Sequence, residues 1–89
     1  MRLHVLNQSQ NPLLTQQCLE NLAADDHLLL IEDAVYLLQQ SDFIASVGAS
    51  LLALADDIHA RGIDNACQLI DHNQWVGLTE QADSIIHWF

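Results

Sequence analysis

The sequence predicts an α/β fold, a three-layer sandwich with a mostly parallel five-stranded sheet. Five short apolar runs alternate with segments of helical character, and the order ends on an apolar run. Residues 28–31 are apolar at every position, a pattern typical of strands that are covered on both faces. A β-α alternation of this kind favours parallel strands joined by right-handed crossovers.

The apolar runs are the predicted strands. They do not alternate cleanly between apolar and polar side chains, which favours burial on both faces over a half-exposed antiparallel sheet. The predicted strands cover residues 3–6, 28–31, 51–54, 68–70 and 84–88.

The first two helices follow the first two strands. Asn11 is a suitable N-cap and Pro12 suits the first helical position, so the first helix begins here and runs to about residue 24. Asp33 can cap a short second helix over residues 34–39. Residues 40–49 are open to two interpretations, a loop or a continuation of this second helix.

The last two helices also begin at aspartates. Asp56 can cap a helix over residues 57–61, and Gly62 follows it as a typical C-terminal glycine. Asp71 with Gln74 three residues later resembles a capping box at the start of the fourth helix.

The charge balance excludes several classes of partner. The chain of 89 residues has twelve acidic side chains and two cationic ones, Arg2 and Arg61, for a formal net charge of -10. Such a surface repels nucleic-acid backbones and anionic membranes. We therefore expect no direct contact with nucleic acid or membrane, and any role near RNA would be carried by partner chains.

Composition also indicates association. A domain of this size buries only somewhat more than ~60% of its unfolded surface, yet 51% of the residues are hydrophobic. The surplus favours an apolar patch that another subunit covers. We expect one domain over residues 1–89, in the cytoplasm, because neither a secretion signal nor a membrane-spanning run of ~18 residues is visible.

Familiar cofactor signatures are absent from the sequence. It has no glycine-rich dinucleotide or phosphate loop, no C-x-x-C and no H-E-x-x-H, which weighs against a nucleotide enzyme and predicts no cofactor and no metal. Acidic residues do follow the predicted strands, where ligands of parallel sheets bind. They can be read as a metal or phosphoacceptor pocket or as helix caps, and we favour caps. These positions are Asn7, Ser9, Glu32, Asp33, Asp56, Asp57, Asp71 and His72.

Histidines and aromatic residues are better explained by packing than by catalysis. His4 and His87 lie within predicted strands and are expected to be packed. His72 beside Asp71 suits acid-base chemistry, but a helix start explains its position as well. Trp75, Trp88 and Phe89 are predicted packing or interface groups, because a base-stacking platform normally has a positive groove.

Cys18 is the one candidate nucleophile. It lies on the apolar face of the first predicted helix, about two turns from its start. A reactive thiol needs a nearby cation or a helix N-terminus to lower its pKa, so packing as a small apolar residue is the favoured interpretation. The same holds for Cys67, and two cysteines do not form a disulfide framework.

An ordered set of local patterns resembles the DsrH/TusB family over nearly the whole chain. In order these are Leu3 and His4 with Asn7 and Ser9; residues 28–33 with Tyr36; residues 53–62; residues 69–71; residues 76–79; and Trp88. This chain is slightly shorter than many relatives, and the gap falls around residues 43–50.

The resemblance implies a subunit of a sulfur-relay complex with a DsrEFH-like fold. Members of this family assemble with DsrE/TusD-like and DsrF/TusC-like subunits into a heterohexamer holding two copies of each. The complex carries sulfur as a cysteine persulfide, and the main acceptor cysteine belongs to the DsrE/TusD-like subunit. Some DsrH-like members have a cysteine on the first helix, and Cys18 matches that position. The resemblance thus makes Cys18 a candidate auxiliary sulfur carrier, although several TusB-like members lack it.

Three functional hypotheses follow. The leading one is a subunit that supports 2-thiolation of the tRNA wobble uridine and delivers sulfur to a downstream carrier protein. The second is a DsrH-type subunit in dissimilatory sulfur oxidation, with Cys18 as auxiliary persulfide carrier. The third is a small α/β ligand- or metal-binding module that uses the acidic strand ends, such as Asp33 and Asp56.

Overall fold

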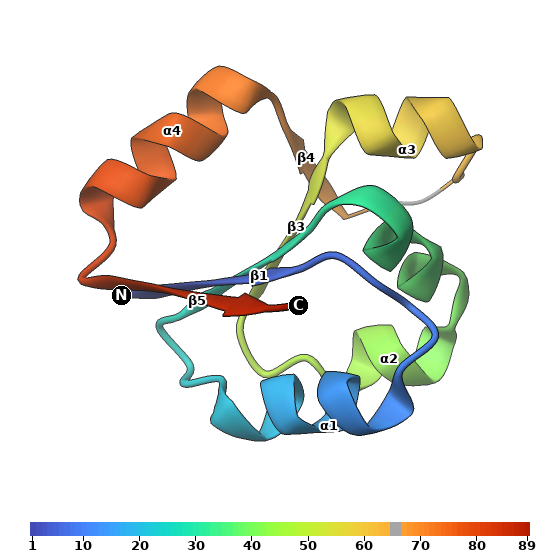
Figure 1. The fold of residues 1–89 in the computed structure, drawn as a ribbon, viewed down its shortest axis with the longest axis horizontal. Helices are drawn as coiled ribbons and strands as arrows, with labels where there is room; N and C mark the ends of the chain where they lie inside the picture. Colours follow the sequence, from blue (N-terminus) through green and yellow to red (C-terminus); the bar gives the residue numbers. More distant parts are fainter. Residues whose placement is uncertain (65–66) are drawn as a thin grey trace.

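The computed structural model describes residues 1–64 and 67–89, and these parts form a five-stranded sheet in which every strand pair is parallel. The strand order is β4-β3-β2-β1-β5 (Figure 1). The predicted α/β class is confirmed, and the sheet is parallel throughout rather than mostly parallel. The strands are β1 (Arg2–Leu6), β2 (His27–Leu30), β3 (Ser50–Leu54), β4 (Gln68–Ile70) and β5 (Ser84–Trp88).

The helices lie on both faces of this sheet. Along β1 to β4 each new strand is added on the same side of the previous one, so right-handed crossovers place their helices on one face. The connection from β4 to β5 runs back across the sheet, and its helix α4 lies on the opposite side from α1 and α2 (Figure 1). The helices are α1 (Pro12–Asn21), the 3₁₀ helix η1 (Glu32–Gln39), α2 (Ser41–Ser46), α3 (Ala55–Arg61) and α4 (His72–Gln81).

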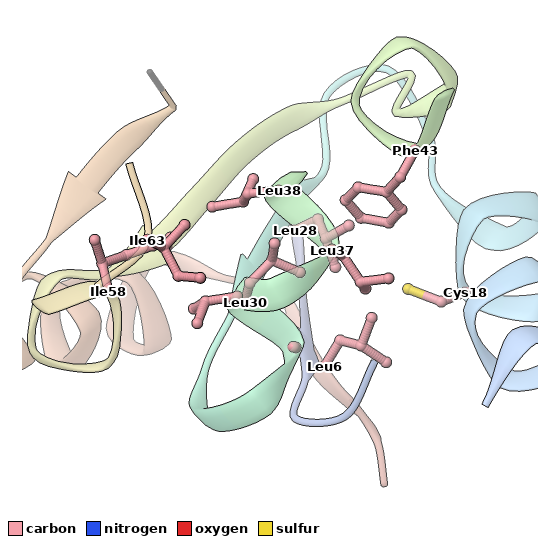
Figure 2. Packing of buried hydrophobic residues seen from close by; sticks show 12 residues of the cluster. Leu6, Cys18, Leu28, Leu30, Leu37, Leu38, Phe43, Ile58 and Ile63 are labelled. Carbon is pink, nitrogen blue, oxygen red and sulfur yellow. The ribbon is translucent and has the colours of Figure 1, made fainter. Parts of the chain in front are cut away.

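Two apolar clusters separate the three layers. The larger cluster lies between the sheet and the helices α1, η1, α2 and α3, and Figure 2 shows its buried side chains. The smaller cluster lies on the α4 face, where Trp75 and Leu78 cover strand residues such as Leu3 and Leu29. The fully apolar β2 is explained by this arrangement, because Leu28 and Leu29 are buried on opposite faces.

Several helices begin or end at the capping residues that the sequence predicts. The Asn11 side chain accepts from the Leu14 N–H at 3.1 Å, and Asp71 and Gln74 form a reciprocal capping box. Gly62 ends α3 in the left-handed conformation, with φ +61°. Residues 40–49, which were open to two interpretations, contain a separate short helix, α2.

Two predicted caps are wrong. Ile31 occupies the N-cap position of η1 and Leu54 that of α3, so both helices begin directly from the strand without a linking turn. Asp33 and Asp56 therefore lie inside the first turn, where a carboxylate interacts with the helix dipole but does not cap it. Asp33 instead accepts a hydrogen bond from Arg61 at 2.9 Å.

The expectation that His87 is packed is also wrong. β5 lies at the edge of the sheet, and by its register His87 shares the α4 face with Val5. α4 covers the middle of that face and leaves His87 exposed. His4, in contrast, is fully buried, as predicted.

Candidate functional site

Cys18 lies in the middle of α1 and is fully buried. Its side chain points toward the larger cluster, which includes Leu6, Leu37 and Phe43 (Figure 2). Burial in these apolar surroundings raises the pKa of the Cys18 thiol to about 12. The thiol is therefore protonated at neutral pH.

This protonation state limits what Cys18 can do chemically. The thiolate is the form that attacks a persulfide or disulfide sulfur. Both cations of the chain, which could lower the pKa of a thiol, are bound to carboxylates, Arg2 to Asp26 and Arg61 to Asp33. In the described conformation Cys18 packs as a small apolar residue, and α1 would have to move before a sulfur donor could reach it.

Cys67 is the second cysteine of the chain and lies just before β4. It is half-buried, and burial raises the pKa of its thiol as well. Its sulfur donates a long hydrogen bond to the Gln68 carbonyl at 3.6 Å. Its environment thus also favours the protonated form.

A buried ionic cluster at the start of β1 is the most highly connected polar site of the described residues. Asp26, in the loop before β2, accepts from the Arg2 side chain at 2.9 and 3.1 Å and from the Arg2 and Ala23 backbone N–H groups at 3.0 Å each. His4 Nε2 lies 3.0 Å from the same carboxylate. Burial alone would raise the pKa of Asp26, but these hydrogen bonds outweigh it and hold that pKa well below its usual range.

The C-terminal strand is tied to this cluster through Trp88. Its indole Nε1 donates to His4 Nδ1 at 3.1 Å, and the two rings are within 7° of parallel with centroids 6.2 Å apart. An indole N–H can only donate, so Nδ1 accepts and the proton of the neutral imidazole is on Nε2, facing Asp26. The chain Trp88–His4–Asp26–Arg2 thus joins both ends of the fold.

Sequence reasoning missed Asp26 and its contacts with Arg2 and His4. The available signal was His4 itself, because a histidine inside a buried strand needs hydrogen-bond partners. Nothing local pointed to Asp26 as the partner, since the two residues are 22 positions apart. The environment is that of a structural ion pair, sealed from solvent at His4 and Asp26.

At the carboxyl ends of the strands, Arg61 organises the acidic residues. It donates to Asp33 at 2.9 Å and to Asp57 at 3.3 Å, and Asp57 accepts from the Glu32 N–H at 2.8 Å. Glu32 has φ +51°, a conformation that a non-glycine residue rarely adopts. These carboxylates, for which a pocket was the less favoured interpretation, instead hold the start of η1 against α3.

The remaining acidic candidates do not gather with them. Asp71 caps α4, and Asp56 lies 3.4 Å from His72 at an exposed position. Among the described residues, no group of three or more His, Cys, Asp or Glu side chains has the spacing to hold a metal ion. A pocket of about 240 Å³ does lie beside Ser9, Asp33 and Tyr36.

Two larger grooves flank the sheet. One, of about 340 Å³, lies between α1 and α2 and is lined by Leu19 and Phe43, with Asp42 at its side. The other, of about 320 Å³, lies beneath α4 and is lined by His27 and several glutamines. Within residues 1–64 and 67–89, no helix is long and apolar enough to cross a bilayer.

Comparison with known proteins identifies the family. Residues 9–85 match the family described as "DsrH like protein". The chain belongs to this family. It is also 35% identical over 75 residues to Protein TusB of Photorhabdus laumondii subsp. laumondii, with 75% of this chain and 79% of that protein covered. The predicted DsrH/TusB resemblance is confirmed.

A solved structure supports the fold independently. The solution structure of protein Tm0979 from Thermotoga maritima superposes on this chain with a TM-score of 0.71, covering 91% of this chain and 93% of that one. Sequence identity is 22%, so the likeness concerns the fold alone.

Proposed function

We propose that this DsrH/TusB-like domain of residues 1–89 is a subunit of a heterohexameric sulfur-relay complex. Two copies of it would assemble with two copies each of a DsrE/TusD-like and a DsrF/TusC-like subunit. Family membership and the similarity to a TusB protein support the sulfur-relay role. The surplus of apolar residues supports a subunit that is completed by partners.

The burial of Cys18 carries the proposed division of labour. Sulfur transfer between cysteines begins when a thiolate attacks the terminal sulfur of a persulfide; the new S–S bond forms as the old one breaks and the donor leaves as a thiolate. A thiol with a pKa near 12 is a poor candidate for this step. In this proposal the main acceptor cysteine belongs to the DsrE/TusD-like partner, as the family resemblance implies, and this chain supports the assembly.

The proposed destination of the sulfur is 2-thiouridine at the tRNA wobble position, reached through a downstream sulfur-carrier protein in the cytoplasm. The internal pairing of Arg2 and Arg61 supports a role without direct tRNA contact, since both cations are already neutralised by carboxylates. Contacts to tRNA belong to other proteins of the relay.

A second candidate function is dissimilatory sulfur oxidation by a DsrH-type subunit with Cys18 as auxiliary persulfide carrier. The family match by the DsrH description favours it. It requires α1 to expose Cys18 within the assembly, and this role of Cys18 stays a prediction.

Native mass spectrometry tests the proposed assembly. The chain is measured alone and after co-expression with the two related small proteins encoded beside its gene. A heterohexamer with two copies of each chain is the expected result. A monomer or homodimer that ignores both neighbours would contradict the proposal and would direct attention to the acidic strand ends as a ligand site, tested by melting with and without Mg²⁺ or Ca²⁺.

Cys18→Ala separates the two candidate functions. In the assembled complex, this variant keeps sulfur transfer to the downstream carrier if Cys18 is structural. Loss of transfer with the hexamer intact would support the auxiliary-carrier function instead.

A further inference from the structure

The edge strand β5 is open to pairing with another chain. In the described part of the chain, β1 is its only neighbouring strand. Natural sheet edges are usually protected by charged residues, proline, bulges or very short strands. Residues 84–89 read Ser-Ile-Ile-His-Trp-Phe, with neither a charged residue nor proline, whereas the opposite edge strand β4 has only three residues. β5 therefore leaves a row of backbone N–H and C=O groups facing outward.

Apolar side chains accompany this free backbone. Ile85 is 41% exposed and Phe89 is 58% exposed. His87, on the same face as Ile85, is exposed and contacts the Phe89 ring, with centroids 4.8 Å apart. Backbone groups together with alternate apolar side chains are what an added strand requires.

The edge is also held in place from within. β5 pairs with β1 along its whole length, from Arg2 opposite Ser84 to Leu6 opposite Trp88 (Figure 1). The Trp88 indole donates to the buried His4 and packs against the larger cluster. A strand fixed in this way loses little conformational freedom on binding, which favours association.

The net charge of the chain indicates which kind of chain can pair with β5. Two copies of a chain with net charge -10 repel one another, and neither Arg2 nor Arg61 is available to compensate, because each is bound to carboxylates of its own chain. At the start of β5, the exposed Asp83 pairs with the N-terminal amine at 2.6 Å. These two charges neutralise each other, so the acidity that a partner has to match is that of the chain as a whole.

We infer that β5 pairs with an edge strand of a different chain, one that is less acidic than this chain and has apolar side chains at alternate positions. The inference rests on the proposed function, which requires partner subunits, and it assigns the surface by which this chain meets one of them. The added strand extends the parallel sheet across the subunit boundary and covers Ile85 and Phe89.

Matched lysine substitutions test the edge. Ile85→Lys and Phe89→Lys place charge on the exposed row, whereas Val76→Lys makes the same change on α4, at a side chain that is 57% exposed. Each variant is co-expressed with the two related subunits and its affinity for them is measured. The two edge variants weaken assembly about tenfold or more, since each loses an apolar side chain that the partner strand would bury, while Val76→Lys leaves it unchanged. Circular dichroism checks that each variant is folded.

Hydrogen exchange distinguishes strand pairing from side-chain contact. On assembly, amides within residues 84–88 gain protection if the partner adds a strand.

The outcomes separate this inference from the proposed function. If the wild-type chain forms no complex with the two subunits, the proposed function fails and the inference fails with it. If the complex forms and the edge variants bind like wild type, or residues 84–88 gain no protection, only the inference is overturned. Sedimentation of the chain alone is expected to show a monomer; a dimer abolished by Ile85→Lys would show that a second copy occupies the edge, against the inference.

Discussion

Burial keeps the Cys18 thiol protonated, so this side chain packs as a small apolar residue. The closest isostere, serine, is then a poor replacement, because its hydroxyl would be buried without water. Alanine removes the sulfur but adds no polar group. The two substitutions therefore differ in a way that reports the polarity of the site.

We predict that Cys18→Ser destabilises the protein more than Cys18→Ala does. The buried hydroxyl costs about 1–3 kcal/mol, whereas loss of one small group costs about 1 kcal/mol. Urea unfolding of both variants measures the difference. Equal stability of the two would indicate that water or a polar group reaches position 18.

Because of Asp26, we predict that the free energy of unfolding falls at acidic pH. Its pKa is lowered in the folded state, so its contribution to stability is present above the ordinary Asp pKa of about 4 and is lost as the pH falls below that value. We expect Asp26→Asn to lower the free energy of unfolding at pH 7 by about 3 kcal/mol and to flatten its decline below pH 4. Asp42→Asn, at an exposed acid, is the control and should change neither quantity. A variant of Asp26 with the wild-type acid profile would contradict the assignment.

We predict that Trp88 stabilises the protein through the hydrogen bond that its indole N–H donates to His4. In Trp88→Phe, His4 Nδ1 keeps its buried position but loses its donor, at a cost of about 1–3 kcal/mol. Trp75→Phe, on the other face of the sheet, is the control. The indole N–H resonance of Trp88 in the Trp75→Phe protein should lie far from that of a free indole and exchange slowly. Rapid exchange would show that the bond to His4 does not persist in solution.

At the scale of elements, the sequence correctly predicted the helix starts that are defined by residues close together in the chain. Asn11 with Pro12 and Asp71 with Gln74 are complete within a few residues, and both starts were predicted correctly. Asp33 and Asp56 failed as caps because their role depends on where the preceding strand stops. A strand that leads straight into a helix moves the cap position back to an apolar residue.

Contacts between residues far apart in the chain could not be predicted from the sequence pattern, for a different reason. The bond between Trp88 and His4 joins residues 84 positions apart, and it exists only because β5 returns to pair with β1. The exposure of His87 has the same origin, since it depends on β5 taking the edge. A sequence that predicts five strands does not by itself give their order.

The end of α3 gives a prediction at this scale. Gly62 has φ +61°, so Gly62→Ala should destabilise the protein by about 1 kcal/mol. Gly48→Ala is the matched control, because Gly48 has no left-handed φ and nothing within 4 Å of an added Cβ among the described residues. Thermal melts compare the two. A loss at Gly48 as large as that at Gly62 would contradict the assignment of the strain to the helix end.

At the scale of the whole molecule, the charge and the exposed apolar residues both indicate a subunit that partners complete. Every cationic side chain is neutralised inside the chain, and carboxylates remain on the surface. Apolar residues meanwhile remain exposed at the β5 edge, Ile85 by 41% and Phe89 by 58%. Both features suit a subunit whose surface is finished by less acidic partners and whose chemistry lies in one of them.

The location of the persulfide in the assembled complex tests this division of labour most directly. The complex is loaded with sulfur by a persulfide donor, and the intact mass of each subunit is measured under denaturing, non-reducing conditions. We predict that the additional sulfur atom appears on the DsrE/TusD-like partner while this chain keeps its unmodified mass. Sulfur that appears first on Cys18 would contradict it.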